Sequence, residues 1–237
     1  MSDKKIELVV IMPVYNEENA ISDVISKWTK ELNRIGMNYQ IHVYNDGSND
    51  RTLEILNEVA SNNQILTVHD KENTGHGTTI LKAYRENISK DWIFQTDSDD
   101  EMSPEYFKYL WEKREDYDFL IGKRNNRTQA TPRKIISFIS RITVRLFYGK
   151  GIWDVNSPYR LMRISKLKDI ILNIPKDTFA PNVIISGMVC MKKLKVLEIP
   201  VPHQNRQTGE VSIKKFKLLK AAFKSYFQTI KYRIVKR

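Results

Sequence analysis

The densest concentration of chemically active side chains in the sequence is an acidic run. Four carboxylates fall within five residues, those of Asp97, Asp99, Asp100 and Glu101, directly after the apolar stretch Trp92–Thr96. Such carboxylates repel one another unless a cation neutralises them, and their oxygens are the hard ligands that Mg²⁺ and Mn²⁺ prefer. The run therefore predicts a divalent-cation site. The structural alternative is an acidic N-terminus for the helix that follows, where acids are favourable.

A second candidate is the glycine-containing segment Asn73-Thr74-Gly75-His76-Gly77. Its G-x-G spacing lacks the third glycine of a dinucleotide-binding fingerprint, and the chain has no G-x-x-x-x-G-K-[ST] sequence, so neither of these nucleotide sites is expected. Two interpretations stay open. The small residues allow a tight turn before a helix, or they let a phosphate approach the N-terminus of that helix.

The elements that must position these groups follow from the hydrophobic pattern. Short apolar runs rich in β-branched residues predict strands, and stretches with helical spacing between them predict helices. The strands are expected at Glu7–Met12, Tyr39–Tyr44, Gln64–His69, Trp92–Thr96 and Tyr117–Ile121. The helices are expected at Ala20–Ile35, Asp50–Ala60, Gly77–Ile88 and Pro104–Lys113. This alternation predicts an α/β fold, with a mostly parallel sheet flanked by helices on both faces.

Polar residues follow the strands at their carboxyl ends, where ligands bind in such sheets. After about residue 124 the alternation is expected to break down into a basic loop, an apolar helix at Ile135–Phe147, an aromatic-rich segment at Ile152–Met162, a strand at Val196–Val201 and a last helix from Ile213. No linker rich in Gly, Ser or Pro divides the chain. We therefore expect one catalytic domain over residues 1–212, and a basic amphipathic helix over 213–237 that belongs to it or associates with a membrane.

The net charge of +11 is concentrated in that last segment, which holds nine basic and no acidic residues from Lys214 to Arg237. Its apolar residues form one stripe at helical spacing: Phe216, Leu219, Phe223, Tyr226, Phe227, Ile230 and Ile234. This composition predicts a helix that lies on an anionic membrane surface. The alternative is a helix that packs on the domain with its lysines in solvent.

The cellular setting is indicated by what the sequence contains. No stretch approaches about 18 consecutive apolar residues, so no bilayer-spanning segment is expected. The single cysteine, Cys190, excludes an internal disulfide framework and fits a reducing compartment. We expect a cytoplasmic protein that is peripheral on the cytoplasmic face of the membrane. No recognised RNA- or DNA-binding module is present, so nucleic acid is not an expected partner.

Four motifs in order resemble those of the inverting nucleotide-sugar transferases of glycosyltransferase family 2, which have the Rossmann-like GT-A fold. They are Pro13-Val14-Tyr15-Asn16-Glu17-Glu18, Asn45-Asp46-Gly47-Ser48, Asn73 with Gly75 and Gly77, and Asp97-Ser98-Asp99. The resemblance implies a UDP-sugar or GDP-sugar donor bound by Pro13, Tyr15, Glu17, Asp46, Gly75, Asp97 and Ser98. It also implies Mg²⁺ or Mn²⁺ held by Asp97 and Asp99, with Glu101 as a possible third ligand.

The second half resembles the polyprenyl-phosphate sugar transferases, the group of dolichol-phosphate mannose synthase. The matching pieces are residues 121–124, 133–137, 154–160 and 206–212. The resemblance implies that Arg124, Arg133 and Ser137 hold the acceptor phosphate, and that Arg206 and Ser212 belong to a segment that closes on the donor pyrophosphate. Solvated loop charges are the alternative for the arginines.

Two departures from that group stand out. Residues 179–182 read Phe-Ala-Pro-Asn where an acidic residue is expected, and the membrane-spanning hairpin or helix that usually follows the catalytic domain is missing. A separate membrane protein is therefore a possible partner.

The sequence as a whole predicts a metal-dependent, inverting glycosyltransferase that moves a sugar from a nucleotide donor to dolichyl or undecaprenyl phosphate. A rival within the same class is transfer to a hydroxyl of a cell-surface glycan, which requires a general base that the sequence does not identify. A rival from another class is a nonenzymatic basic adaptor for membranes or nucleic acid. It is disfavoured because an adaptor has no need for four ordered donor-site motifs.

Overall fold

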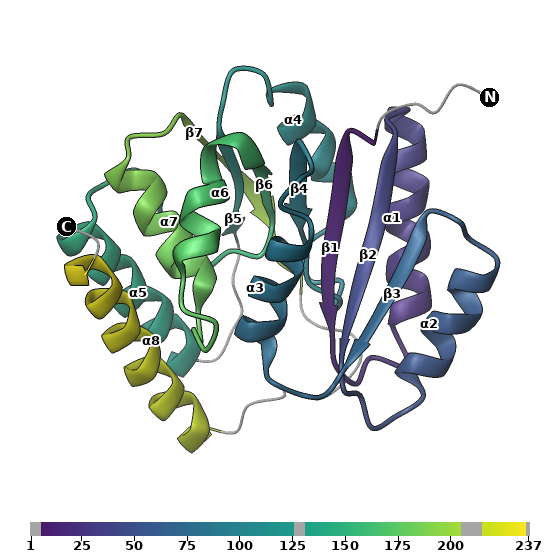
Figure 1. Ribbon diagram of the computed structural model, residues 1–237, viewed down its shortest axis with the longest axis horizontal. Coiled ribbons are helices and arrows are strands. Elements are labelled where there is room, and N and C mark those ends of the chain that lie inside the picture. The colour runs from purple at the N-terminus through teal and green to yellow at the C-terminus, as the bar shows by residue number, and fades with distance from the viewer. Residues whose placement is uncertain (1–5, 126–130, 205–214, 236–237) are drawn as a thin grey trace.

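The computed structural model describes residues 6–125, 131–204 and 215–235, with the backbone alone for residues 131–135 and 215–222. Within these residues seven strands form one sheet in the order β3-β2-β1-β4-β6-β5-β7 (Figure 1). The strands are β1 Leu8–Val14, β2 Tyr39–Asp46, β3 Leu66–Lys71, β4 Trp92–Gln95, β5 Phe119–Asn125, β6 Arg160–Arg163 and β7 Val196–Pro202. β6 is antiparallel to β4 and β5, and the other pairings are parallel. The expected mostly parallel α/β sheet is confirmed.

The helices cover both faces of this sheet. They are α1 Ile21–Ile35, α2 Thr52–Ser61, α3 His76–Glu86, α4 Phe107–Glu112 after a 3₁₀ turn at Pro104–Tyr106, α5 Thr131–Phe147, α6 Ile164–Asn173, α7 Pro181–Met191 and α8 Lys215–Val235. Alternate residues of β1 enter two separate cores, as the twofold period of a strand requires. Val9 and Ile11 pack with α3, α6 and α7, whereas Leu8, Val10 and Met12 pack with α1, α2 and α4.

The second half is more regular than the sequence indicates. We expected the strand–helix alternation to break down after residue 124, but β6, α6 and α7 continue it. β6 is only four residues long and has an arginine at each end, so its apolar pattern is too short to identify a strand. Its first arginine, Arg160, is completely buried.

Helices α5 and α8 lie side by side at the end of the molecule away from β3 (Figure 1). The buried residues of α8 are Ser225, Thr229 and Tyr232, and the Tyr148 hydroxyl donates a hydrogen bond of 2.6 Å to the Thr229 carbonyl. Of the stripe residues whose side chains are described, Phe223 and Phe227 face outward, 58% and 64% exposed, and Tyr226 and Ile230 are half-buried. The described part of the helix therefore packs mainly through Ser225, Thr229 and Tyr232 rather than through the stripe. Among the described helices, none combines the length and apolar character needed to cross a membrane.

Candidate functional site

The carboxyl ends of β1 and β2 are joined by hydrogen bonds between the turns that follow them. The Asn16 amide donates to Ser48 Oγ at 3.0 Å, and the Asn49 amide donates to Asn16 Oδ1 at 2.8 Å. Asn16 adopts a left-handed backbone conformation with φ of 55°. These contacts place Pro13, buried in β1, and the partly exposed Tyr15 at this edge of the sheet.

Asp46, at the end of β2, holds the segment between β3 and α3. Its carboxylate accepts hydrogen bonds of 2.9 Å from the amides of Thr74 and Gly75, and it forms an ion pair with Lys71. Gly77 packs directly against the backbone of Phe179: a Cβ at position 77 would fall 2.0 Å from the Phe179 carbonyl oxygen. Asp46 therefore shapes the loop that contains Gly75, a role that the sequence did not indicate. Its predicted contact with the donor stays a prediction.

Asp97 follows β4 and carries an unsatisfied carboxylate oxygen. Its Oδ1 is buried and accepts no hydrogen bond from the described residues, and His76 Nε2 is 3.8 Å away. An uncompensated buried carboxylate oxygen is costly, and a cation removes that cost. Ser98 beside it is buried. The arrangement fits a divalent cation at Asp97.

Two other carboxylates of the acidic run, those of Asp99 and Asp100, interact with groups of the protein. Asp99 Oδ1 accepts a hydrogen bond of 3.3 Å from the Glu101 amide. Asp100 has φ of 56° and forms an ion pair with Lys27. The described residues contain no group of three His, Cys, Asp or Glu side chains arranged to hold a metal. A third protein ligand at Glu101 therefore stays a prediction.

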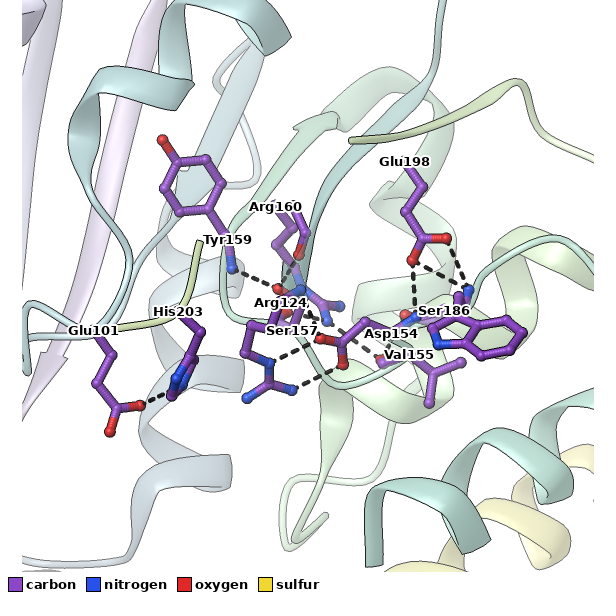
Figure 2. A network of polar contacts seen from close by, with 12 residues as sticks. Glu101, Arg124, Asp154, Val155, Ser157, Tyr159, Arg160, Ser186, Glu198 and His203 are labelled. Carbon is purple, nitrogen blue, oxygen red and sulfur yellow. Dashed lines mark hydrogen bonds and ion pairs between the residues drawn. The ribbon is translucent and has the colours of Figure 1, made fainter. Parts of the chain in front are cut away.

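Glu101 is paired with a histidine that sequence analysis did not single out. Its Oε2 lies 2.8 Å from Nε2 of His203, which is almost fully buried just after β7 (Figure 2). The Gln204 amide donates to the Glu101 carbonyl at 2.9 Å, and the His203 amide donates to the Asn125 carbonyl at 3.0 Å. These contacts fasten the acidic run to the chain just before the segment of Arg206 and Ser212. No sequence pattern links residues so far apart.

Arg124, at the end of β5, is bound by Asp154. Its Nε and Nη2 donate hydrogen bonds of 2.8 Å and 2.9 Å to the two carboxylate oxygens, and both side chains are largely buried (Figure 2). Burial alone would lower the pKa of Arg124, but Asp154 outweighs it and the pKa is raised. Asp154 is fixed in turn, because its amide donates to Glu198 Oε1 at 2.8 Å.

Arg160 fixes the loop on the other side of Asp154. Its Nε donates to the Ser157 carbonyl at 2.8 Å and its Nη1 donates to the Asn182 carbonyl at 3.1 Å, while burial lowers its pKa to about 10. The Asn182 side chain is buried in a further network, accepting from the Tyr84 hydroxyl at 3.0 Å and donating to Gln95 Oε1 at 2.9 Å. A neutral amide thus occupies the place where an acid was expected.

The remaining predicted residues are not brought into this network by the described contacts. Glu17 is buried, and its amide donates to Thr52 Oγ1 at 2.8 Å. Ser137 lies half-buried on α5, and Arg133 lies on the same helix with its backbone alone described. Arg206 and Ser212 lie outside the described residues. The roles proposed for all of these stay predictions.

Comparisons with known proteins agree with the fold and the motifs. An undecaprenyl-phosphate 4-deoxy-4-formamido-L-arabinose transferase from Edwardsiella ictaluri (strain 93-146) is 29% identical over 224 residues, which cover 92% of this chain and 67% of that protein. Glucosyl-3-phosphoglycerate synthase from Mycobacterium tuberculosis, solved with Mn²⁺, uridine diphosphate and glucosyl-3-phosphoglycerate, has a TM-score of 0.69 at 15% identity, covering 95% of this chain and 79% of that one.

A second solved structure has the same architecture. The mannosyltransferase PcManGT from Pyrobaculum calidifontis, in complex with GDP-Man and Mn²⁺, has a TM-score of 0.60 at 13% identity, covering 98% of this chain and 74% of that one. Both structural likenesses concern the fold and confirm the expected GT-A architecture. The model described as Glycosyl transferase family 2 matches residues 9–171. The chain therefore belongs to glycosyl transferase family 2.

Proposed function

We propose that this glycosyltransferase moves a sugar from a nucleotide donor to a polyprenyl phosphate such as undecaprenyl or dolichyl phosphate. The observation that carries the proposal is the similarity of 92% of this chain to an undecaprenyl-phosphate transferase. A phosphate monoester has a second pKa of about 6, so it is largely a dianion at pH 7 and attacks without a general base. The undecaprenyl-phosphate transferase similar to this chain supports the same acceptor class.

The donor end of the site is assigned to Asp97 and Asp99. The orphaned Oδ1 of Asp97 fits Mg²⁺ or Mn²⁺, and the Mn²⁺ bound by the two similar enzymes supports a divalent ion. When bound, such an ion neutralises the charge that develops on the departing nucleoside diphosphate. Asp99 lies two residues after Asp97 in the same acidic run, and Asp46 keeps the loop of Gly75 in place for the donor. The donor is a UDP-sugar or a GDP-sugar.

The acceptor is a membrane lipid, and the outer surface of α5 and α8 is suited to meet a membrane. Its exposed apolar residues are Phe138, Ile139, Leu146, Phe147, Phe223, Phe227, Ile234 and Val235. Exposed basic residues lie among them: Arg145, Lys224 and Lys231. An apolar surface edged by cations binds anionic bilayers. We assign this surface to the cytoplasmic face of the membrane, with a separate membrane protein as a further partner.

The pH dependence of transfer tests the acceptor assignment. With saturating Mn²⁺ and a panel of UDP-sugars and GDP-sugars, transfer to a short polyprenyl phosphate is expected to rise between about pH 5 and pH 7, as the phosphate becomes a dianion, and then to level off. The corresponding alcohol is expected to accept no sugar at any pH. Efficient transfer to the alcohol or to a glycan hydroxyl would instead establish the hydroxyl-acceptor alternative.

A further inference from the structure

The turn between α5 and β6 presents one tryptophan to solvent. Trp153 is 52% exposed, whereas Trp28, Trp92 and Trp111 are 2%, 5% and 6% exposed. Its backbone is nevertheless held firmly, because its amide donates to both carboxylate oxygens of Glu198 at 3.1 Å. The fold thus fixes the position of this residue while leaving its large apolar ring outside the core. A ring displayed in this way is suited to an external partner.

Two cations lie over the Trp153 ring. The guanidinium carbon of Arg141 is 3.9 Å from the ring centroid and Lys123 Nζ is 5.0 Å from it. Among the described residues, no carboxylate forms an ion pair with either cation. Arg141 also lies 5.3 Å from the ring of Phe138, which is 54% exposed. The cluster therefore offers two positive charges that no carboxylate of the described residues pairs with, beside two exposed aromatic rings.

This combination matches one kind of partner by its chemistry. A phospholipid headgroup presents a phosphate next to hydrocarbon, so cations and aromatic rings bind it together. Tryptophan is enriched at the level of the headgroups because its ring is amphipathic. Arg141 and Phe138 lie on α5, so the cluster continues the exposed apolar surface of α5 and α8. The Glu198 carboxylate accepts hydrogen bonds from the backbone amides of Trp153 and Asp154.

We propose that Trp153, Lys123, Arg141 and Phe138 form a binding site for the phosphate group of anionic membrane lipids. Lys123 and Arg141 hold the phosphate oxygens, while Trp153 and Phe138 enter the headgroup layer. The inference rests on the proposed function in taking a membrane as the partner. It goes further by naming a lipid site that lies outside α8 and beside the Arg124–Asp154 pair. Lipid binding at this site places the catalytic edge of the sheet against the bilayer.

Tryptophan fluorescence of the full chain tests the site without donor or metal. Because the other three tryptophans are buried, addition of phosphatidylglycerol vesicles is expected to shift the emission to shorter wavelength through Trp153 alone. Trp153→Phe is expected to abolish the shift but to keep vesicle binding within about twofold, since a ring remains. Phosphatidylcholine vesicles are expected to give little shift. An unchanged spectrum while the protein sediments with phosphatidylglycerol vesicles would overturn the assignment.

Vesicle sedimentation of variants tests the cations and the ring separately. Arg141→Ala is expected to weaken partitioning about fivefold, the effect of about 1 kcal/mol per basic residue near an anionic surface. Trp153→Ala is expected to weaken partitioning measurably because the interfacial ring is lost. The matched controls are Lys168→Ala and Tyr109→Ala, which remove an exposed charge on α6 and an exposed ring on α4. Both are expected to bind as the unaltered chain does. Equal losses in the controls, or none in the cluster variants, would contradict the site.

Three further outcomes separate the lipid source and the proposed function. If the emission shift requires polyprenyl phosphate in phosphatidylcholine vesicles, the cluster binds the acceptor and the bulk-lipid assignment is wrong. If vesicle binding behaves as expected but no sugar reaches polyprenyl phosphate, the proposed function fails while the lipid site stands. If sugar transfer is normal but vesicles never shift the emission of Trp153, the lipid site is contradicted and the proposed function stands.

Discussion

The Glu101 carboxylate lies 2.8 Å from the buried Nε2 of His203, and this contact joins the acidic run after β4 to the end of β7. The two residues are distant in sequence, and backbone hydrogen bonds from Gln204 and His203 strengthen the junction. The acidic run is therefore positioned from two sides, by β4 at its start and by β7 at its end. His203→Ala is expected to weaken metal-dependent donor binding rather than abolish it, while His203→Gln keeps a hydrogen-bond donor and is expected to restore much of it.

The cation assignment predicts a specific effect of Asp97→Asn. The substitution removes the charge but keeps the shape, so the protein without metal is expected to be at least as stable as before, because like charges in the run repel less. Stabilisation by Mn²⁺ with a nucleotide sugar is expected to disappear. At about a hundred times the dissociation constant this stabilisation amounts to about 2.7 kcal/mol. Differential scanning fluorimetry measures the stability without metal and the stabilisation by Mn²⁺ with donor. If Mn²⁺ and donor still stabilise the variant, Asp97 is not a metal ligand.

We expect a large loss of stability when only one partner of the Arg124–Asp154 ion pair is substituted. Asp154→Asn leaves a buried guanidinium without its counter-charge, and such losses are about 3 kcal/mol or more. Urea unfolding checks this value. The double substitution Arg124→Met with Asp154→Leu is expected to recover most of the stability but no transfer activity. A single substitution that costs less than about 1 kcal/mol would show that the pair is not held as described.

Packing at Gly77 predicts a loss of stability when a methyl group is added. A methyl group there would meet the Phe179 carbonyl, which is backbone and cannot turn away. Gly77→Ala is expected to destabilise the fold by about 1–3 kcal/mol, the usual range for overpacking. Gly149→Ala is a useful contrast, because its Cβ meets no atom within 4 Å and only its φ of 112° opposes the change. Chemical denaturation of both variants separates steric overlap from backbone strain.

The pair of His42 and His69 predicts how stability changes with pH. Burial, followed by the nearby His69, lowers the pKa of His42 from 6.5 to about 4. Since the folded pKa is lower than the unfolded one, the contribution to stability is complete above about pH 6.5 and declines as the pH falls towards about 4. Allowing for the partial exposure of the group, the loss is about 2 kcal/mol. His42→Gln is expected to flatten the curve of unfolding free energy in this range, and an unchanged slope would contradict the assignment.

Much of the fold could be predicted from the sequence, because its signals are local. The apolar runs of β1 and β2 and the helical spacing of α1 suffice to indicate a parallel α/β sheet. The antiparallel β6 was missed because Arg160 and Arg163 mark its ends as polar, although Arg160 is buried by hydrogen bonds to carbonyl groups. Hydropathy cannot show that a buried arginine will find such partners.

The site was predictable in its motifs but not in its contacts. The carboxylates after β4 were identified from their spacing, whereas the pairing of Glu101 with His203 depends on where β7 ends. The sequence also did not indicate which face of α8 is buried. Ser225 and Thr229 are polar in sequence, yet together with Tyr232 they form the buried face, and their small side chains let α8 approach α5 closely. Such contacts are properties of the assembled fold rather than of any segment.

The most direct test of the central claim is a competition between acceptors in one reaction. The full chain, Mn²⁺ and a labelled nucleotide sugar are supplied with equal concentrations of undecaprenyl phosphate, undecaprenol and a surface glycan. Label is expected in the lipid phosphate, with Asp97→Asn inactive and Arg133→Ala reduced about ten- to a hundredfold by loss of a charge-assisted bond to the phosphate. Label in the glycan or in undecaprenol, with Arg133→Ala unimpaired, would contradict the account.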